Sequence, residues 1–309
     1  ETSELIAEQL GADDSLAGLA ATIAERAVGN PFFVKEIVRD LAERGILHGR
    51  RGAYTFNAAV AEVSVPPTLY AVIAARIDRL DNEAKRTLNA AAVVGTRCAA
   101  DLLTTIGVEP AFDALVDAEM VDQVKFSSPE EYVFRQPMIR TVAYETLLLA
   151  ERADVHRRVA AAIEAREPAL VDQNAALIGE HLEAAGDHGA AYGWHMRAGA
   201  WSRNRDIAAA RLSWARARHV AQELPADDPN RLAMRIAAGT LLCATAYRTA
   251  ESMSHSGFQE VRELAAAAGD KRSLALAMLG QYTDHMVHGR VAEASALGTE
   301  VRALLEAIG

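Results

Sequence analysis

The sequence predicts a mainly α-helical protein with a small β-hairpin. Half of its 309 residues are hydrophobic but only 6% are aromatic, and alanine supplies much of the apolar content, especially after residue 150. Small side chains of high helix propensity favour closely packed helices over sheets. Apolar residues recur at helical spacing along most of the chain, and short turns such as Gly186-Asp187 separate the segments. The clearest β pattern lies between residues 121 and 134.

Composition also excludes several classes of function. The net charge of −10 and the pI near 5.4 argue against broad, sequence-independent DNA binding. The longest apolar runs are far shorter than a membrane span. Cys98 and Cys243 lie far apart in apolar surroundings, which is typical of buried thiols in a reducing compartment. We therefore predict a soluble cytoplasmic protein that binds neither membranes nor, directly, nucleic acid.

Residues 1–62 are predicted to form three helices followed by a hairpin. The stretch Gly29-Asn30-Pro31 opens the third helix, because Asn30 can cap it and Pro31 suits the first helical position. Such a turn can also press a proline ring and free N–H groups against a nucleotide. The expected helices cover residues 2–10, 15–27 and 30–44, and the hairpin covers residues 46–56.

Residues 63–150 have the pattern of a winged-helix domain, in which helices are followed by a β-hairpin. The helix before the hairpin, residues 111–119, carries three acids and no base. A recognition helix of that composition would meet phosphate repulsion and lack donors for base edges. We therefore do not assign this domain to DNA. The expected helices cover residues 68–79, 82–94, 99–106 and 110–119, and a further helix starts near Pro137.

Residues 151–309 are predicted to form antiparallel helical hairpins. One stretch fits tetratricopeptide spacing, with Gly179, Leu182, Ala191 and Ala198 at positions where small or apolar residues let two helices approach. The match is loose elsewhere, so we expect a helical array with a concave surface for a protein partner. The expected helices cover residues 151–167, 174–185, 188–204, 206–224, 229–250, 257–268, 271–288 and 291–308.

No motif in the chain indicates catalysis. It lacks a phosphate-binding loop, and it has no His-Glu-x-x-His, Cys-x-x-Cys or Gly-x-Ser-x-Gly pattern. His181, His188 and His195 are seven residues apart, but a turn interrupts any single helix between the first two. We therefore favour packing roles over metal binding. Trp194 and Trp201 share a helical face, and we favour core packing over an aromatic pocket.

Four stretches of the sequence are informative in combination: residues 29–37 (GNPFFVKEI), 65–68 (VPPT), 74–80 (AARIDRL) and 132–140 (YVFRQPMIR). Together they resemble a known family, the signal-transduction P-loop ATPases with numerous domains (STAND ATPases). The likeness is to the actinobacterial group joined to class III adenylate/guanylate cyclase domains or to LuxR-type DNA-binding domains. It extends over nearly the whole chain.

The resemblance implies a segment of a longer protein, with an ATPase core and its phosphate loop before residue 1. Residues 1–62 would be the helical lid of that ATPase, residues 63–150 the winged helix, and residues 151–309 a sensor or scaffold. The intact protein would bind ATP or ADP, whereas this segment would not bind either tightly. Its partners would be the ATPase and output domains of the same chain and a protein on the helical-repeat surface.

The resemblance also implies site residues. The Gly-x-Pro turn of the lid packs on adenine in such ATPases, which maps to Gly29 and Pro31 with Asn30 between them. The family's phosphate-sensing histidine aligns with Gln136, which can donate a hydrogen bond but adds no positive charge. The lock on ADP would then be weaker, or would rely on Arg135 or Arg140. Alternatively, Gln136 only caps the helix that begins at Pro137.

Three functions follow from these expectations. The first is the regulatory segment of an ATPase-linked adenylate cyclase that acts in cAMP signalling. The second is the same segment in a LuxR-type transcriptional regulator, with DNA contacted by another domain. The third is a protein-interaction scaffold without nucleotide switching.

Overall fold

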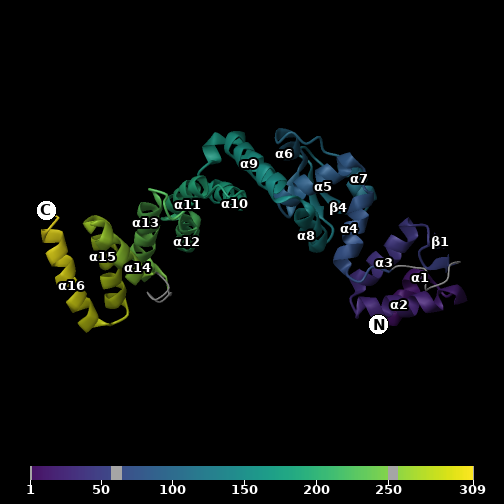
Figure 1. Cartoon of the computed structure of the whole chain (residues 1–309), viewed down its shortest axis with the longest axis horizontal. Helices are drawn as coiled ribbons and strands as arrows, with labels where there is room; N and C mark the ends of the chain where they lie inside the picture. Colours follow the sequence, from purple (N-terminus) through teal and green to yellow (C-terminus); the bar gives the residue numbers. More distant parts are fainter. Residues whose placement is uncertain (1, 57–64, 250–256, 309) are drawn as a thin grey trace. The chain divides into compact units, whose positions relative to one another are not determined.

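The computed structural model describes residues 2–56, 65–249 and 257–308. It divides into two compact units, Glu1–Leu149 and Ala150–Gly309. Both units are mainly helical, and the small antiparallel sheets lie in the first (Figure 1). The predicted fold class, mainly α with a small β-hairpin, is confirmed. The predicted domain boundary at residues 62 and 63 lies outside the described residues.

The N-terminal part of the first unit, residues 2–56, consists of helices and a two-stranded hairpin. The hairpin is antiparallel and pairs Leu47 with Phe56, both of which are buried. Their side chains join a core that also contains Val65 and Val72, so the N-terminal part packs on the start of the next helix. The elements are α1 (Thr2–Leu10), a 3-10 turn (Asp14–Leu16), α2 (Ala17–Ala27), α3 (Pro31–Glu43), β1 (Leu47–Arg50) and β2 (Ala53–Phe56).

The second part of the first unit, residues 65–149, contains a three-stranded antiparallel sheet in the order β3-β5-β4. The predicted hairpin is β4 and β5, whose core Tyr132 stacks on Phe112 with ring centroids 3.8 Å apart. The elements are α4 (Leu69–Arg79), α5 (Asn82–Val94), β3 (Arg97–Ala99), α6 (Ala100–Thr105), α7 (Phe112–Asp117), β4 (Val121–Lys125), β5 (Glu131–Phe134) and α8 (Pro137–Thr146).

Strand β3 was not predicted. We expected a helix from residue 99, whereas Ala99 is the last residue of a strand that pairs with β5. Three residues are too few to show the alternation that identifies a strand in a sequence. The pairing partner, which is 32 or more residues away, supplies the hydrogen bonds that make this segment extended.

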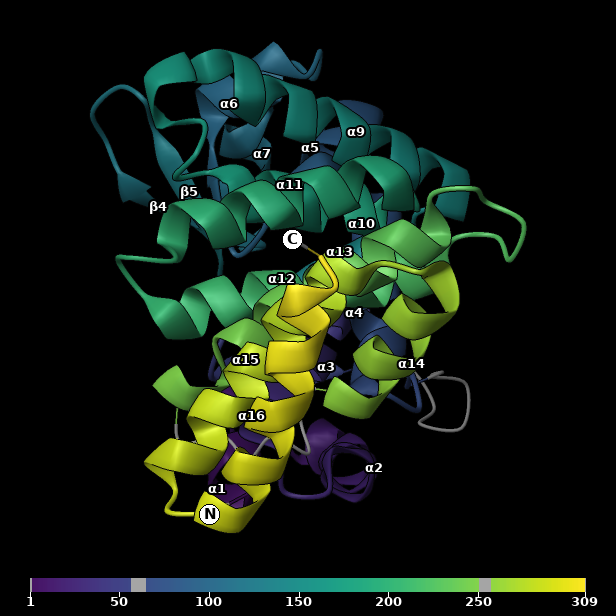
Figure 2. The same ribbon diagram turned by 90° about the vertical axis from the view of Figure 1, so that its left-hand side faces the viewer.

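The second unit is a series of antiparallel helices, as predicted, and several of them are joined by short turns. The helix expected over residues 229–250 ends earlier, at Ala244, and a 3-10 turn follows it. Figure 2 shows α15 and α16 side by side, and α11 packs in the same way between α10 and α12. The elements are α9 (Leu149–Arg166), a 3-10 turn (Pro168–Leu170), α10 (Ala175–Ala184), α11 (His188–Ser202), α12 (Ile207–Glu223), α13 (Arg231–Ala244), a 3-10 turn (Ala246–Arg248), α14 (Phe258–Ala268), α15 (Lys271–Val287) and α16 (Val291–Glu306).

Glycines allow the closest helix contacts of the second unit. A Cβ atom on Gly280 would lie 2.3 Å from the carbonyl oxygen of Cys243, which belongs to the backbone of α13. A Cβ atom on Gly199 would lie 2.2 Å from the indole nitrogen of Trp214. Real Cβ atoms do not come so close to other heavy atoms, so only glycine permits these two helix crossings.

The burial of the tryptophans differs from the expected core packing at Trp194 and Trp201. Trp214 is buried in the core between α12 and α13. Trp194 and Trp201 are only half-buried, and each lies beneath an arginine. The guanidinium of Arg197 is 5.0 Å from the Trp194 ring, and that of Arg205 is 4.5 Å from the Trp201 ring. Core packing was therefore the wrong prediction for these two residues, since cation–π contacts at the surface hold their rings.

Candidate functional site

The predicted turn before α3 has the local structure that its residues favour. Gly29 has a φ of +81°, which glycine adopts without strain. The Asn30 Oδ1 atom accepts hydrogen bonds from the backbone N–H groups of Phe32 and Phe33, at 3.0 and 3.2 Å. Pro31 follows as the first residue of the helix. The sequence therefore identified both the cap and the start of α3 correctly.

The same hydrogen bonds change what this turn can offer to a ligand. We expected free N–H groups, but those of Phe32 and Phe33 are engaged by Asn30, and that of Val34 donates to the Asn30 carbonyl oxygen at 3.1 Å. Pro31 has no N–H group. The start of α3 is therefore unsuited to binding a phosphate through its backbone. It presents instead the exposed proline ring and the glycine backbone.

Val28 belongs to the same exposed surface and was not predicted as a site residue. This residue is 86% exposed, and its φ of +44° is left-handed. A β-branched residue in that conformation is a genuine outlier, which costs on the order of 1–3 kcal/mol. The sequence signal was an apolar residue placed between the end of α2 and the turn. Val28, Gly29 and Pro31 form what we call the apolar tip of the N-terminal part, residues 2–56.

Gln136 and Arg135 lie at the junction between β5 and α8. Gln136 is the residue before α8, yet its side chain makes no capping hydrogen bond, so the capping alternative is wrong. Arg135 donates to Asp122 from Nε and Nη2, at 3.0 and 2.7 Å, and from Nη1 to Glu119. The hydrogen bond to Asp122 raises the pKa of Arg135 above its usual value. Arg135 is therefore a cation held between two carboxylates.

Arg140 is engaged elsewhere. Its Nε donates to the carbonyl oxygen of Ala92 at 3.0 Å, and its guanidinium lies 5.9 Å from the Tyr144 ring. The bond to Ala92 connects α8 to α5, whereas Tyr144 belongs to α8 itself. Of the two arginines that the resemblance suggested, Arg135 is therefore the one that pairs with carboxylates.

A shared carboxylate connects the two predicted halves of the site. Glu119 accepts from Arg135 and also from Arg39 of α3. Arg39 lies nine residues after Asn30, which is about 13 Å along a helix. The structure thus joins the apolar tip to Arg135 and Gln136 through α3 and Glu119, but it does not bring them together in one pocket.

A buried ion pair lies beside this connection. Arg76 of α4 pairs with Glu36 of α3, and both side chains are almost fully buried. The Arg76 Nη2 atom also donates to the carbonyl oxygen of Ala118 at 2.7 Å. Asp40, also buried, accepts from Arg79. The sequence analysis missed these residues, although acids three and four positions apart on one helix face are a signal for such a network.

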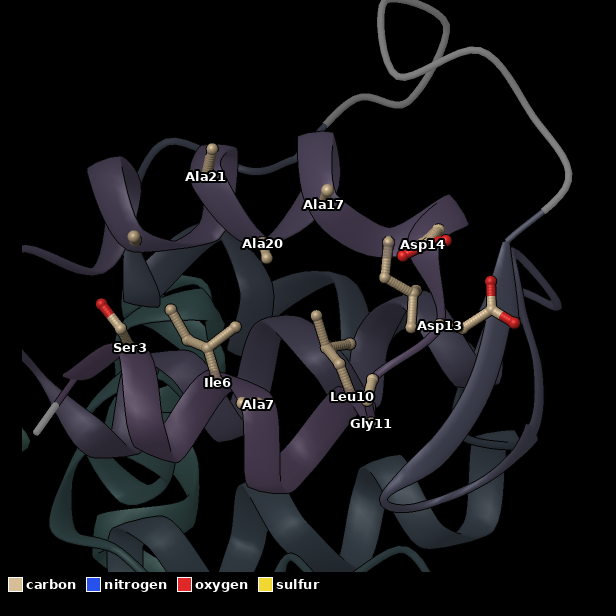
Figure 3. A pocket seen from close by; sticks show the side chains of 13 residues that line it. Ser3, Ile6, Ala7, Leu10, Gly11, Asp13, Asp14, Ala17, Ala20 and Ala21 are labelled. Atoms are coloured by element: carbon tan, nitrogen blue, oxygen red, sulfur yellow. The ribbon is translucent and has the colours of Figure 1, made fainter.

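The groove between α1 and α2 is not built for an anion. It has a volume of about 360 Å³ and is lined mainly by small apolar residues (Figure 3). Asp13 and Asp14 lie at one end of it, which gives that end a negative charge. Neither helix contributes a basic side chain to the lining. The chemistry of this groove therefore differs from that expected of a phosphate site.

Two of the three spaced histidines, His181 and His195, are buried packing residues of the second unit. The Nδ1 atoms of His181 and His156 are 2.8 Å apart, and His195 Nε2 lies 3.0 Å from Glu183. Within residues 2–56, 65–249 and 257–308, no three His, Cys, Asp or Glu side chains are arranged to hold a metal ion. Both cysteines are buried and neither forms a disulfide, as predicted. No helix in the same ranges is long and apolar enough to cross a bilayer.

Comparison with known proteins gives one match. A family described as a domain of unknown function (DUF8739) matches residues 1–48. The matched stretch contains α1, α2 and α3 and therefore includes the whole apolar tip. No curated protein and no solved structure matches the chain.

Proposed function

We propose that this chain is a regulatory segment of a nucleotide-dependent signalling protein related to the STAND ATPases. In this proposal residues 1–62 act as the helical lid, residues 63–150 as the winged helix, and residues 151–309 as a sensor or scaffold. The observation that carries the proposal is the apolar tip. An exposed Val28 in a left-handed conformation, next to an exposed proline, has no packing role within the first unit and suits a ligand or partner surface.

The chemistry of the tip suits a purine. A proline ring and a glycine backbone can lie flat against an aromatic base, and Val28 adds apolar contact at its edge. The start of α3 has no spare donors for phosphates, so those would be bound by the phosphate loop of an ATPase core elsewhere in the intact protein. Gln136 and Arg135 would meet the phosphate end and report whether ATP or ADP is bound.

Signalling would follow from different contacts in the two nucleotide states, through a shift in population between two arrangements. The output we favour is cyclic AMP synthesis in the cytoplasm by a cyclase domain of the same protein. The helical array would bind a protein partner. Because most phosphate contacts lie outside these residues, the isolated chain should bind ATP or ADP weakly, without submicromolar affinity in calorimetry.

Photolabelling of the intact protein tests the proposal. A purine-azide analogue of ATP should label residues 28–31, as identified by mass spectrometry of the peptides. Replacing Val28 with Ser and Pro31 with Ala should weaken ATP binding about tenfold, which corresponds to about 1.4 kcal/mol. Pro168→Ala is the matched control, because this proline also opens a helical turn but lies in the second unit.

Labelling confined to other segments, with affinity unchanged in the double variant, would contradict the proposal. So would an intact protein that has no phosphate loop. Either result would leave the helical scaffold as the remaining function.

A further inference from the structure

The turn after α7 places a glutamate where backbone geometry favours glycine. The N–H of Glu119 bonds to the carbonyl oxygen of Val116, and the N–H of Met120 bonds to that of Leu115, both at 2.9 Å. This is a Schellman end, whose left-handed position is usually glycine. Glu119 occupies it with a φ of +52°. The backbone alone gives no reason for a glutamate here, so the role of this residue lies in its carboxylate.

The carboxylate of Glu119 joins two separate parts of the first unit. Arg39 reaches it from α3 in the N-terminal part, and Arg135 reaches it from the junction of β5 and α8. Asp122 holds the other edge of the Arg135 guanidinium at 2.7 Å. Removing the negative charge of Glu119 would therefore release Arg39 from this turn, while Arg135 would keep Asp122.

A second, more deeply buried contact holds the same turn. Arg76 pairs with Glu36 and donates to the carbonyl oxygen of Ala118, the residue just before Glu119. The Arg76 and Glu36 side chains are 1% and 3% exposed, whereas those of Arg39, Arg135 and Glu119 are 28%, 35% and 43% exposed. Exposed ion pairs are weak and are screened by salt. A buried pair is costly to break.

We propose that Glu119 is an electrostatic latch between α3 and the sheet-containing part of the first unit. The exposed ion pairs of Glu119 with Arg39 and Arg135 break and form again. The buried Glu36–Arg76 pair stays formed while they do so. The relevance of the latch to nucleotide sensing rests on the proposed function, because α3 carries the apolar tip at its start. The latch itself is a property of the first unit and needs no nucleotide.

The distance between two spin labels tests the latch in the 309-residue chain. Arg50→Cys on the β1–β2 hairpin and Ser127→Cys on the β4–β5 turn provide exposed labelling sites on the two parts. The native cysteines do not compete, because both are buried and burial raises the pKa of Cys98 to about 12. The measurement is the distance distribution by pulsed electron paramagnetic resonance, without nucleotide.

Two variants separate the charge from the backbone. Glu119→Gln removes only the charge, and we expect it to broaden the distribution or add a second distance. Glu119→Gly should broaden it in the same way while keeping or raising the melting temperature, because glycine relieves the left-handed strain. A purely structural role for Glu119 would lower the melting temperature instead. Glu109→Gln, at an exposed position away from the latch, is the matched control and should leave the distribution unchanged.

Salt gives an independent measurement on the unaltered latch. At about 1 M salt the screening length falls to about 3 Å, so the exposed pairs weaken and the distribution should broaden as it does in Glu119→Gln. An unchanged distribution in Glu119→Gln overturns the latch. If that variant fails to fold, an unchanged distribution at high salt does so. A failed photolabelling experiment, in contrast, would overturn the purine contact and leave the latch intact.

Discussion

Each unit of the chain buries an arginine, and the two arginines are satisfied in different ways. Arg76 in the first unit pairs with the carboxylate of Glu36 and so connects α3 to α4. Arg211 in the second unit donates at 2.7 Å to the carbonyl oxygen of Leu242 in the last turn of α13, and at 3.2 Å to the hydroxyl of Thr245. The first contact depends on an opposite charge, and the second completes a helix end.

The helix interfaces of the two units also differ in the side chains that make them. The face of α3 that meets α4 is rich in acids, whereas the helices of the second unit approach through glycine and alanine. The first unit should therefore respond mainly to changes of charge, and the second mainly to changes of volume. The following predictions test that contrast, beginning with the largest expected effect.

Arg76→Leu should destabilise the first unit by about 3 kcal/mol, because it removes the buried partner of Glu36 and leaves this buried carboxylate with the longer, partly exposed contact to Arg39 at 3.3 Å. Hydrogen exchange of the α3 and α4 amides measures the effect. Replacing both Glu36 and Arg76 with Leu should recover most of the loss, since no uncompensated charge remains. A double variant as unstable as the single one would show that packing, and not charge, governs this interface.

Gly280→Ala should destabilise the second unit by about 1–3 kcal/mol, because the new methyl group would collide with the α13 backbone at Cys243. All three tryptophans of the chain lie in the second unit, and Trp214 packs on Leu242 of α13. Denaturation followed by tryptophan fluorescence therefore reports this contact.

Gly193→Ala is the matched control for Gly280→Ala. A Cβ atom on Gly193 would meet nothing within 4 Å. Alanine should therefore stabilise α11 by about 0.5–1 kcal/mol through its higher helix propensity. Equal effects of the two substitutions would contradict the role of close approach.

The smallest expected effect is a pH dependence of the second unit. Burial lowers the pKa of His195, against the opposing influence of its hydrogen bond to Glu183. In the unfolded chain the same histidine has a pKa near 6.5. The unfolded chain therefore binds more protons than the folded chain at mildly acidic pH. Stability should accordingly fall as the pH drops below about 6.5, and it should level off below the folded pKa.

Fluorescence-monitored unfolding between pH 7 and pH 5 measures this dependence. His195→Gln should flatten it, whereas His219→Gln, at an exposed position on α12, should not. If the free energy of unfolding of His195→Gln still falls with pH as steeply as before, the pH dependence belongs to other groups.

Much of the fold was predictable because its causes are local. Asn30 and Pro31 start α3, and Asp81 caps α5 through the N–H of Ala84, wherever the rest of the chain lies. The candidate site was predictable only in part. The sequence located Gly29, Asn30, Pro31, Arg135 and Gln136, but not the connection between them, because Arg39 and Glu119 are 80 residues apart.

The sequence by itself determined most of the helices, the two hairpins and the burial of both cysteines, since apolar periodicity, capping and propensity act over a few residues. Only the tertiary structure decided which charges meet on Glu119, that Gly280 lies against Cys243, and that β3 is a strand. Each of these depends on contacts between distant segments. The energy of such a contact depends on burial and distance, and neither can be read from the order of the residues.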